Sequence, residues 1–530
     1  MAHPARRRLT VPLLALGMAA TLAPAITASP ASAAPAARPA PASAYGQVPV
    51  GAAASLAPYA RQRLTWKRCA ADKPAAYRCA TLKVPLDYRA PRGRTIDVAI
   101  SRLRTSEPGK RRGVLTFNPG GPGGAGLDLA LEAADALPKR VLDQYDLVGF
   151  DPRGVGRSTP VACGLTEEEK RFPRPTRSKA EFAANVAWAK GVAGKCRARH
   201  GDLLPHLTTR NTARDMDVLR AALGEKKLSY LGVSYGTALG AVYTQLFPKR
   251  VDRFVLDSAI DPAWMWRDMF RVWGSEAEPA FRRWARWTAR HDAAYHLGAT
   301  PAQVERTFWR LVRRADAKPL VVGGETLDGA AVRHTMRRGF FTVRQGAETL
   351  VTLKRAAAGE TVPGLPTGTT PDNEMSAQWV VVCADASWPR DVRTYYRDSL
   401  ADAARYPLYG DFASSIPPCA FWPRGAEPVT EVDNKVPALI VQNEWDSQSP
   451  LLTARGMHRA LKGSRMVTVD EGEGHGVLFA EPRSACAEDT ALDYLATGRL
   501  PARDVTCRAA PGRSPRPTGA APNAFRPAAP

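Results

Sequence analysis

Ser234 lies in the pentapeptide Gly232-Val233-Ser234-Tyr235-Gly236, which has the pattern G-x-S-x-G. The apolar residues from Leu228 to Gly232 predict a strand, and the small residues after Tyr235 predict a helix. This strand–turn–helix context is what a nucleophile elbow requires, because flanking glycines permit a turn too tight for a Cβ and leave the hydroxyl above a helix N-terminus. A lone G-x-S-x-G arises by chance in glycine-rich chains, so the flanking elements decide. We predict that Ser234 is a nucleophile for acyl transfer.

The segment 118–124, Asn-Pro-Gly-Gly-Pro-Gly-Gly, could supply the second hydrogen-bond donor that such a nucleophile needs. One donor for the developing oxyanion is the Tyr235 N–H of the elbow itself, and the other normally comes from a loop after an earlier strand. We predict that it is the Gly121 N–H. A phosphate cradle is the alternative use of such glycines, but the segment has neither the Lys-Ser/Thr of a P-loop nor G-x-G-x-x-G spacing.

The general base is expected late in the chain, after the acid. His475 is flanked by glycines and directly follows a predicted strand over 465–470, whereas its rival His458 lies in a predicted solvated helix. The predicted acid is Asp446, in the loop 442–450 that follows another predicted strand. Glu444 and Asp433 are its rivals. The acid would hold the imidazole tautomer and stabilise its charge.

Another glycine-rich turn, 151–156 (Asp-Pro-Arg-Gly-Val-Gly), follows a predicted strand. We interpret its Asp151 and Arg153 as structural residues that brace the turn beside segment 118–124, and not as catalytic groups.

Short apolar runs alternate with helical patterns over most of the chain, which is typical of βαβ units. The fold class predicted is therefore α/β, a mostly parallel sheet with helices on both faces. Residues 59–260 and 408–507 would form the two parts of this core. Between them, 261–407 is rich in Trp and predicts a largely helical cap insertion, which would cover the strand ends where α/β sheets bind ligands. The predicted strands are 113–118, 144–151, 228–232, 253–257, 436–442 and 465–470.

Both ends of the chain differ from this core. Residues 1–33 have three Arg, an apolar run and a small-residue site, which is the pattern of a signal peptide cleaved after Ala33. Residues 34–58 are an Ala/Pro-rich linker or pro-segment, and 508–530 a Pro/Ala-rich tail that should be disordered. No later stretch reaches the roughly 18 apolar residues of a membrane span. We therefore expect a secreted, extracellular protein with no membrane attachment after signal cleavage.

Eight cysteines suit export to an oxidising compartment. They allow roughly a hundred connectivities, and the sequence does not select one; our prediction is sequential pairing. No pair has CxxC spacing, so no metal is predicted, and no cofactor either. The formal net charge is +23. The Arg residues are scattered and no basic block is interleaved with aromatics, so nucleic acid is not an expected partner. We expect a monomer.

Taken together, segments 118–124 and 151–156, the elbow, Asp446 and His475 resemble the tripeptidyl aminopeptidases secreted by Streptomyces, relatives of the proline iminopeptidases in the α/β-hydrolase superfamily. The resemblance spans roughly residues 60–507. It implies an α/β-hydrolase fold and a serine hydrolase that removes tripeptides from the free N-termini of peptides or unfolded proteins. Pro119 stands where the iminopeptidases usually have His.

Exopeptidase action needs a group that binds the substrate's ammonium, and a carboxylate in or under the cap is the natural device. Asp385, Glu374 and Asp261 are the candidates, and the sequence does not separate them. Two other functions remain open: an esterase or lipase, since the same triad serves any acyl transfer, and a non-catalytic hydrolase fold that binds cell-wall or polyanionic material.

Overall fold

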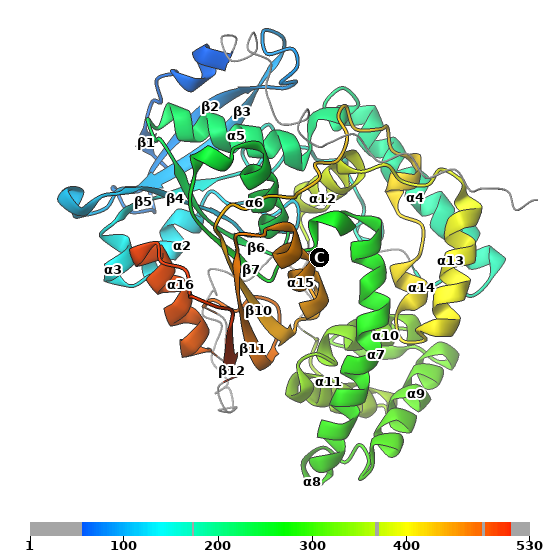
Figure 1. Cartoon of the computed structure of the whole chain (residues 1–530). Helices are drawn as coiled ribbons and strands as arrows, with labels where there is room; N and C mark the ends of the chain where they lie inside the picture. Colours follow the sequence, from blue (N-terminus) through cyan, green and yellow to red (C-terminus); the bar gives the residue numbers. More distant parts are fainter. Residues whose placement is uncertain (1–55, 172–173, 366–369, 480–482, 510–530) are drawn as a thin grey trace, which may run out of the picture. The chain divides into compact units, whose positions relative to one another are not determined.

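The computed structural model describes residues 56–171, 174–365, 370–479 and 483–509 (Figure 1). The predicted signal peptide lies outside these residues, as do 34–55 of the predicted linker and 510–530 of the predicted tail. No helix within the described ranges has the length and apolar character to cross a membrane.

Within the described residues, ten strands form one sheet (Figure 1). From β5 onward neighbouring strands are parallel, while β1, β2 and β3 are antiparallel to their neighbours. The α/β class and the mostly parallel sheet are therefore confirmed. In spatial order the strands are β1 (Lys67–Arg68), β2 (Arg78–Pro85), β3 (Thr95–Leu103), β5 (Tyr145–Phe150), β4 (Gly113–Asn118), β6 (Leu228–Val233), β7 (Val251–Asp257), β10 (Leu439–Trp445), β11 (Arg465–Glu473) and β12 (Val505–Arg508).

All six predicted strands are present, but β1, β2, β3 and β12 were not predicted. Their sequences carry charged residues at solvent-facing positions, such as Lys83 in β2 and Asp97 in β3, which form an ion pair across the two strands. Antiparallel strands with one wet face, such as β2 and β3, lack the continuous apolar run on which the prediction relied. The strand β12, which is parallel to β11, is short and largely solvent-facing.

Helices cover both faces of the sheet, because alternate residues of each buried strand pack on opposite sides. In β4, Val114 belongs to one apolar cluster while Leu115 and Phe117 belong to the other. The first cluster includes helices α4 (Lys179–His200), α5 (Thr209–Ala222), α6 (Tyr235–Leu246) and α15 (Leu451–Ala460); the second includes α2 (Leu129–Ala136), α3 (Lys139–Leu142) and α16 (Ala485–Thr497).

Residues 262–421, between β7 and β10, are mostly helical, and we call them the helical insertion. They have an apolar core of their own, in which Trp284 packs against Phe281 and Phe340. Helices continue past residue 407, and the predicted boundaries 59–260, 261–407 and 408–507 stay predictions. The elements are η5 (Pro262–Trp264), α7 (Arg267–Arg290), α8 (Asp292–Tyr295), α9 (Pro301–Ala317), β8 (Leu320–Val322), β9 (Glu325–Leu327), α10 (Gly329–Gly339), α11 (Val343–Ala357), α12 (Asp372–Asp385), α13 (Val392–Arg405), α14 (Gly410–Ala413) and η6 (Pro418–Phe421).

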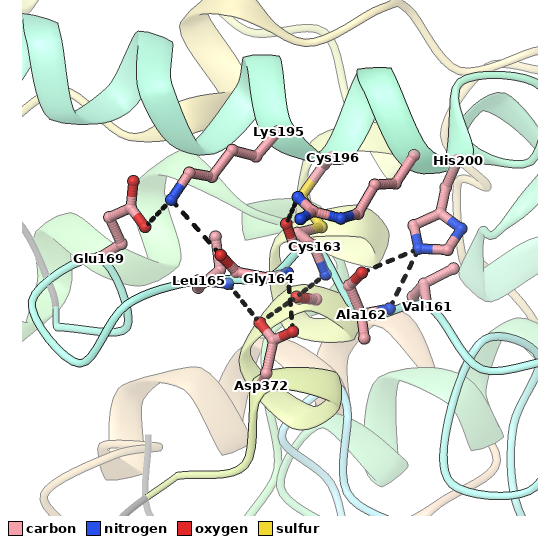
Figure 2. Close-up of a disulfide and its surroundings, with 12 residues drawn as sticks. Val161, Ala162, Cys163, Gly164, Leu165, Glu169, Lys195, Cys196, His200 and Asp372 are labelled. Atoms are coloured by element: carbon pink, nitrogen blue, oxygen red, sulfur yellow. Dashed lines mark hydrogen bonds and ion pairs between the residues drawn. A yellow bond between two sulfur atoms is a disulfide. The ribbon is translucent and has the colours of Figure 1, made fainter.

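The cysteines form four disulfides with the predicted sequential pairing: Cys69–Cys79, Cys163–Cys196, Cys383–Cys419 and Cys486–Cys507. Figure 2 shows the second of these, which ties segment 161–165 to helix α4. On its other side the same segment meets the first turn of α12, where the Asp372 carboxylate accepts the N–H groups of Gly164 at 2.8 Å and Leu165 at 2.9 Å. Segment 161–165 therefore links the insertion to the core.

Candidate active site

Ser234 occupies a strained turn between β6 and α6, with φ 58° and ψ −123°. A non-glycine residue rarely adopts a positive φ, and holding it there costs about 1–3 kcal/mol. The surroundings enforce it: the Ser234 N–H donates to the Asp257 carbonyl at 2.9 Å, and the Ser234 carbonyl accepts from the N–H and hydroxyl of Thr237. The glycines are needed, since a Cβ on Gly232 would lie 2.5 Å from the Gly236 carbonyl oxygen. The turn therefore has the geometry that a nucleophile elbow requires.

The imidazole of His475 and the carboxylate of Asp446 are paired. Nδ1 of His475 lies 2.9 Å from each Asp446 oxygen, and Asp446 is fully buried. Asp446 Oδ1 also accepts the N–H groups of Gln448 and Ser449 at 2.8 and 2.9 Å. These hydrogen bonds fix the position of the Asp446 carboxylate, and the carboxylate in turn fixes the orientation of the His475 ring. Nε2 of His475 makes no hydrogen bond to any described residue, and neither does the Ser234 hydroxyl.

The rival residues are engaged elsewhere. His458 on α15 contacts the Ser464 hydroxyl and Asp504. Glu444 accepts the N–H of Glu471, and Asp433 forms an ion pair with Lys462.

Asp257, at the end of β7, joins the elbow to the loop of His475, and sequence reasoning missed it. Its carbonyl accepts the Ser234 N–H, while its carboxylate accepts the N–H groups of Val477 at 2.9 Å and Leu478 at 2.8 Å. Burial raises the pKa of Asp257 to about 6, opposed by these two amides and by His475. A strand-end carboxylate is a weak signal by itself, because only the fold brings residue 477 beside residue 257.

Segment 118–124, which we call the oxyanion loop after its predicted role, lies against the turn at Ser234. A Cβ on Gly120 would lie 2.6 Å from the Val233 carbonyl oxygen and 2.9 Å from the Ser234 Cβ, so only glycine fits there. The Gly120 N–H is occupied by the Asn118 side chain at 3.1 Å. Among the described residues the N–H of Gly121 has no acceptor. The N–H of Tyr235 is in the first turn of α6, where no intrahelical acceptor exists. Two amides are thus free to receive a negative oxygen.

Comparison with known proteins agrees with this geometry. The profile of the alpha/beta hydrolase fold matches residues 113–482. The chain belongs to the α/β hydrolase fold family. It is 38% identical to tripeptidyl aminopeptidase of Streptomyces lividans, over 88% of this chain and 90% of that protein. It is 30% identical to serine protease Hip1 of Mycobacterium tuberculosis, over 86% and 94%, and to a protein of the same species named carboxylesterase B, over 85% and 91%. The prediction of a serine hydrolase is confirmed.

The turn at 151–156 of this hydrolase has the structural role predicted for it. The Asp151 carboxylate accepts the N–H groups of Gly126 and Leu127, each at 2.9 Å, and so holds the end of the oxyanion loop. Arg153 is buried and pairs with Asp215 at 2.6 Å. The side chains of Asp151 and Arg153 therefore both hold neighbouring segments of the chain in place.

The three candidate ammonium-binding carboxylates differ in their surroundings. Asp385 is buried, and its oxygens accept the Thr209 N–H, the Thr209 hydroxyl and the Trp266 indole N–H. Asp261 caps η5 through the Ala263 N–H and lies 3.8 Å from Arg459. Both are already partnered.

Glu374 is different. It is half-buried in the first turn of α12, and its carboxylate has no hydrogen bond or ion pair within the described residues. Burial alone raises its pKa. Its backbone carbonyl lies directly against the Cα of Gly123 in the oxyanion loop. Of the three, Glu374 is the carboxylate left without a partner beside the catalytic loops.

Proposed function

We propose that this protein is a secreted serine exopeptidase that releases tripeptides from free N-termini. The observation that carries the proposal is the His475–Asp446 pair, joined through Asp257 to the Ser234 elbow. Its relative named tripeptidyl aminopeptidase supports the peptide substrate. Four disulfides support export, since such bonds persist in oxidising compartments.

The proposed chemistry is an acyl-enzyme reaction. Ser234 Oγ attacks the scissile carbonyl carbon and its proton passes to Nε2 of His475. The resulting oxyanion accepts hydrogen bonds from the Gly121 and Tyr235 N–H groups, each donor lowering the barrier by about 3 kcal/mol. His475 then protonates the leaving amine. A water molecule, deprotonated by His475, then attacks the ester carbonyl carbon. The bond to Ser234 Oγ breaks, His475 returns the proton to Oγ, and the tripeptide leaves with a free carboxylate.

We assign the ammonium to Glu374. An unpartnered, partly desolvated carboxylate gains more from a cation than one that already accepts hydrogen bonds, as Asp385 and Asp261 do. Anchoring the N-terminus there would set how many residues reach Ser234.

The test compares a tripeptidyl anilide with its N-acetylated form. The free-amino substrate should be cleaved and the acetylated one should not. Glu374→Gln should lower kcat/KM for the free-amino substrate about 30-fold, roughly 2 kcal/mol. Glu276→Gln is the matched control, because Glu276 on α7 is also a half-buried carboxyl whose pKa is raised by burial alone; it should leave kcat/KM unchanged. Equal cleavage of both anilides would end the exopeptidase proposal.

An esterase is the second candidate, favoured by the relative named carboxylesterase B. It predicts higher kcat/KM on simple p-nitrophenyl esters than on any peptide anilide, with no effect of Glu374→Gln. A non-catalytic binding protein predicts that a fluorophosphonate fails to label the intact chain; labelling that Ser234→Ala abolishes would exclude it.

A further inference from the structure

Arg337 of the helical insertion contacts the loop that carries Asp446. It lies on α10, and its side chain is almost completely buried. One guanidinium nitrogen, Nη1, donates to the Ser447 carbonyl at 2.7 Å, and the other, Nη2, donates to the Gln448 side-chain oxygen at 2.9 Å. The two residues that receive these bonds directly follow the acid in the sequence.

The environment of this cation is unusual. No carboxylate among the described residues lies within ion-pair distance of Arg337, whereas Arg333, one turn earlier on α10, pairs with Asp411 at 2.7 Å. The Arg337 guanidinium instead lies over the rings of Trp273 and Tyr409, 4.8 and 4.9 Å from their centroids. Burial lowers its pKa to about 10, which leaves it charged at neutral pH. The carboxylate charge that favours its charged form is that of Asp446, which it does not contact directly. Burying a cation away from an ion-pair partner is costly, and the hydrogen bonds to Ser447 and Gln448 offset part of that cost.

Trp273 of α7 adds a further bond to the same loop, from its indole N–H to the Gln448 carbonyl at 2.8 Å. Gln448 is therefore held by the insertion at both its carbonyl and its side chain. Its N–H, together with that of Ser449, donates to Asp446 Oδ1. The peptide groups that hold the acid are thus themselves held by α7 and α10.

We propose that Arg337 is a positioning residue for the acid, so that the helical insertion supplies part of the catalytic framework as well as a covering for it. Arg337 acts through Ser447 and Gln448 on Asp446, and through Asp446 on the orientation of His475. This inference rests on the role proposed above for Asp446, but not on the choice of substrate.

The experiment measures the second-order rate of fluorophosphonate labelling at Ser234, because labelling requires the activated serine and no tripeptide. Arg337→Met removes both hydrogen bonds without creating a new buried charge. It should slow labelling about 30-fold, and lower kcat on the best substrate by a similar factor with KM within about twofold. Arg337→Lys keeps the charge but loses the fork of two donors, so its rate should lie between those of the wild type and Arg337→Met.

Arg333→Lys is the matched control, since it alters a buried guanidinium on the same helix that does not touch the acid loop. It should leave labelling within about twofold of the wild type. A structural loss alone would not alter the low-field NMR proton of the His475 Nδ1–H, which Arg337→Met should shift or broaden. If Arg337→Met does not fold, Trp273→Phe, which removes the indole donor to Gln448 and leaves a smaller ring against the Arg337 guanidinium, should give a smaller slowing of the same kind.

Two results separate the possible failures. A folded Arg337→Met variant with the wild-type labelling rate and an unchanged His475 signal would overturn the positioning role while leaving the proposed function intact. Undiminished labelling of Ser234→Ala would instead overturn the proposed nucleophile.

Discussion

The loops of the base and of the acid are both held by the core and by the helical insertion, but through different kinds of contact. The His475 loop is fastened by the core: Asp257 accepts two of its amides, Ser258 accepts the Gly476 N–H, and Asn443 donates to three of its carbonyls. The loop of Asp446 is held by the core through Gln442 of β10, whose side-chain N–H donates to the Ser449 carbonyl at 2.8 Å, and by the insertion through Arg337 and Trp273. At the base loop the insertion contacts the side chains of Glu471 and Glu473 through Arg283 of α7, whereas at the acid loop it binds the backbone carbonyls of Ser447 and Gln448. A chain that carried the same three proposed catalytic residues on the sheet alone would lack part of the support for its acid.

The largest effect is expected from Asp446→Asn, which removes the charge of the proposed acid but leaves the residues that hold its loop unchanged. The amide still has one oxygen to accept the Gln448 and Ser449 N–H groups, so the loop should keep its shape, but it favours the wrong imidazole tautomer. We expect kcat to fall on the order of ten-thousandfold with an unchanged melting temperature. Glu444→Gln, on the same strand end, should stay within about threefold in anilide assays. A greater loss from Glu444→Gln would move the acid to that residue.

Asp257→Ala breaks the attachment of the base to the core. The amides of Val477 and Leu478 lose their buried acceptor, which should lower the free energy of unfolding by about 2–4 kcal/mol and kcat about 100-fold. Asp252→Ala, on the same strand, removes a partly exposed ion pair with Arg112 and a hydrogen bond from the Ser229 hydroxyl, and should cost about 1 kcal/mol. Denaturant unfolding and steady-state kinetics measure both. Wild-type kcat in a folded Asp257→Ala protein would show that the core does not position His475.

Asp385 joins the insertion to the core, because it lies on α12 and its carboxylate accepts hydrogen bonds from Thr209 of α5. Burial raises its pKa from 3.8 to about 6. The folded state then binds this proton more tightly than the unfolded state, so the stability it contributes is complete below pH 4 and is lost as the pH rises towards 6. The wild type should therefore lose about 3 kcal/mol relative to Asp385→Asn between pH 3.5 and about 7. Thermal or denaturant unfolding of both proteins across this range measures it; a difference that does not change with pH would contradict the raised pKa.

The smallest effect concerns the oxyanion loop, whose contact with the insertion runs through α12. The Asn373 side chain accepts the Gly156 N–H and donates to the carbonyls of Gly154 and Val161. The next residue on α12 is Glu374, whose backbone carbonyl lies against Gly123. Asn373→Ala should lower kcat and the affinity for a boronic acid transition-state analogue about fivefold to tenfold. Asn434→Ala, which removes hydrogen bonds far from this loop, is the control and should change neither. Equal losses in both variants would mean that the effect is general destabilisation.

Much of the core could be read from local pattern. Each buried parallel strand is a short apolar run, and Ser234, Asp446 and His475 each follow such a run at the edge where parallel strands end. The antiparallel strands β2 and β3 were not predicted, because one of their faces is polar and their sequences therefore resemble those of loops. The order of the cysteines did not decide their pairing either; the sequential pattern is known only because the fold brings each pair together.

What the sequence determined by itself is the tight turn at Ser234 and the chemistry proposed for it, because such a turn needs glycine at particular positions along one short segment. What only the tertiary structure decided is which distant groups complete it. Asp257 and Arg337 carry no local signature, since their partners lie more than a hundred residues away in the chain. Likewise Asp385, Glu374 and Asp261 are equivalent carboxylates in the sequence. Burial and neighbouring donors satisfy two of them and leave the third without a partner.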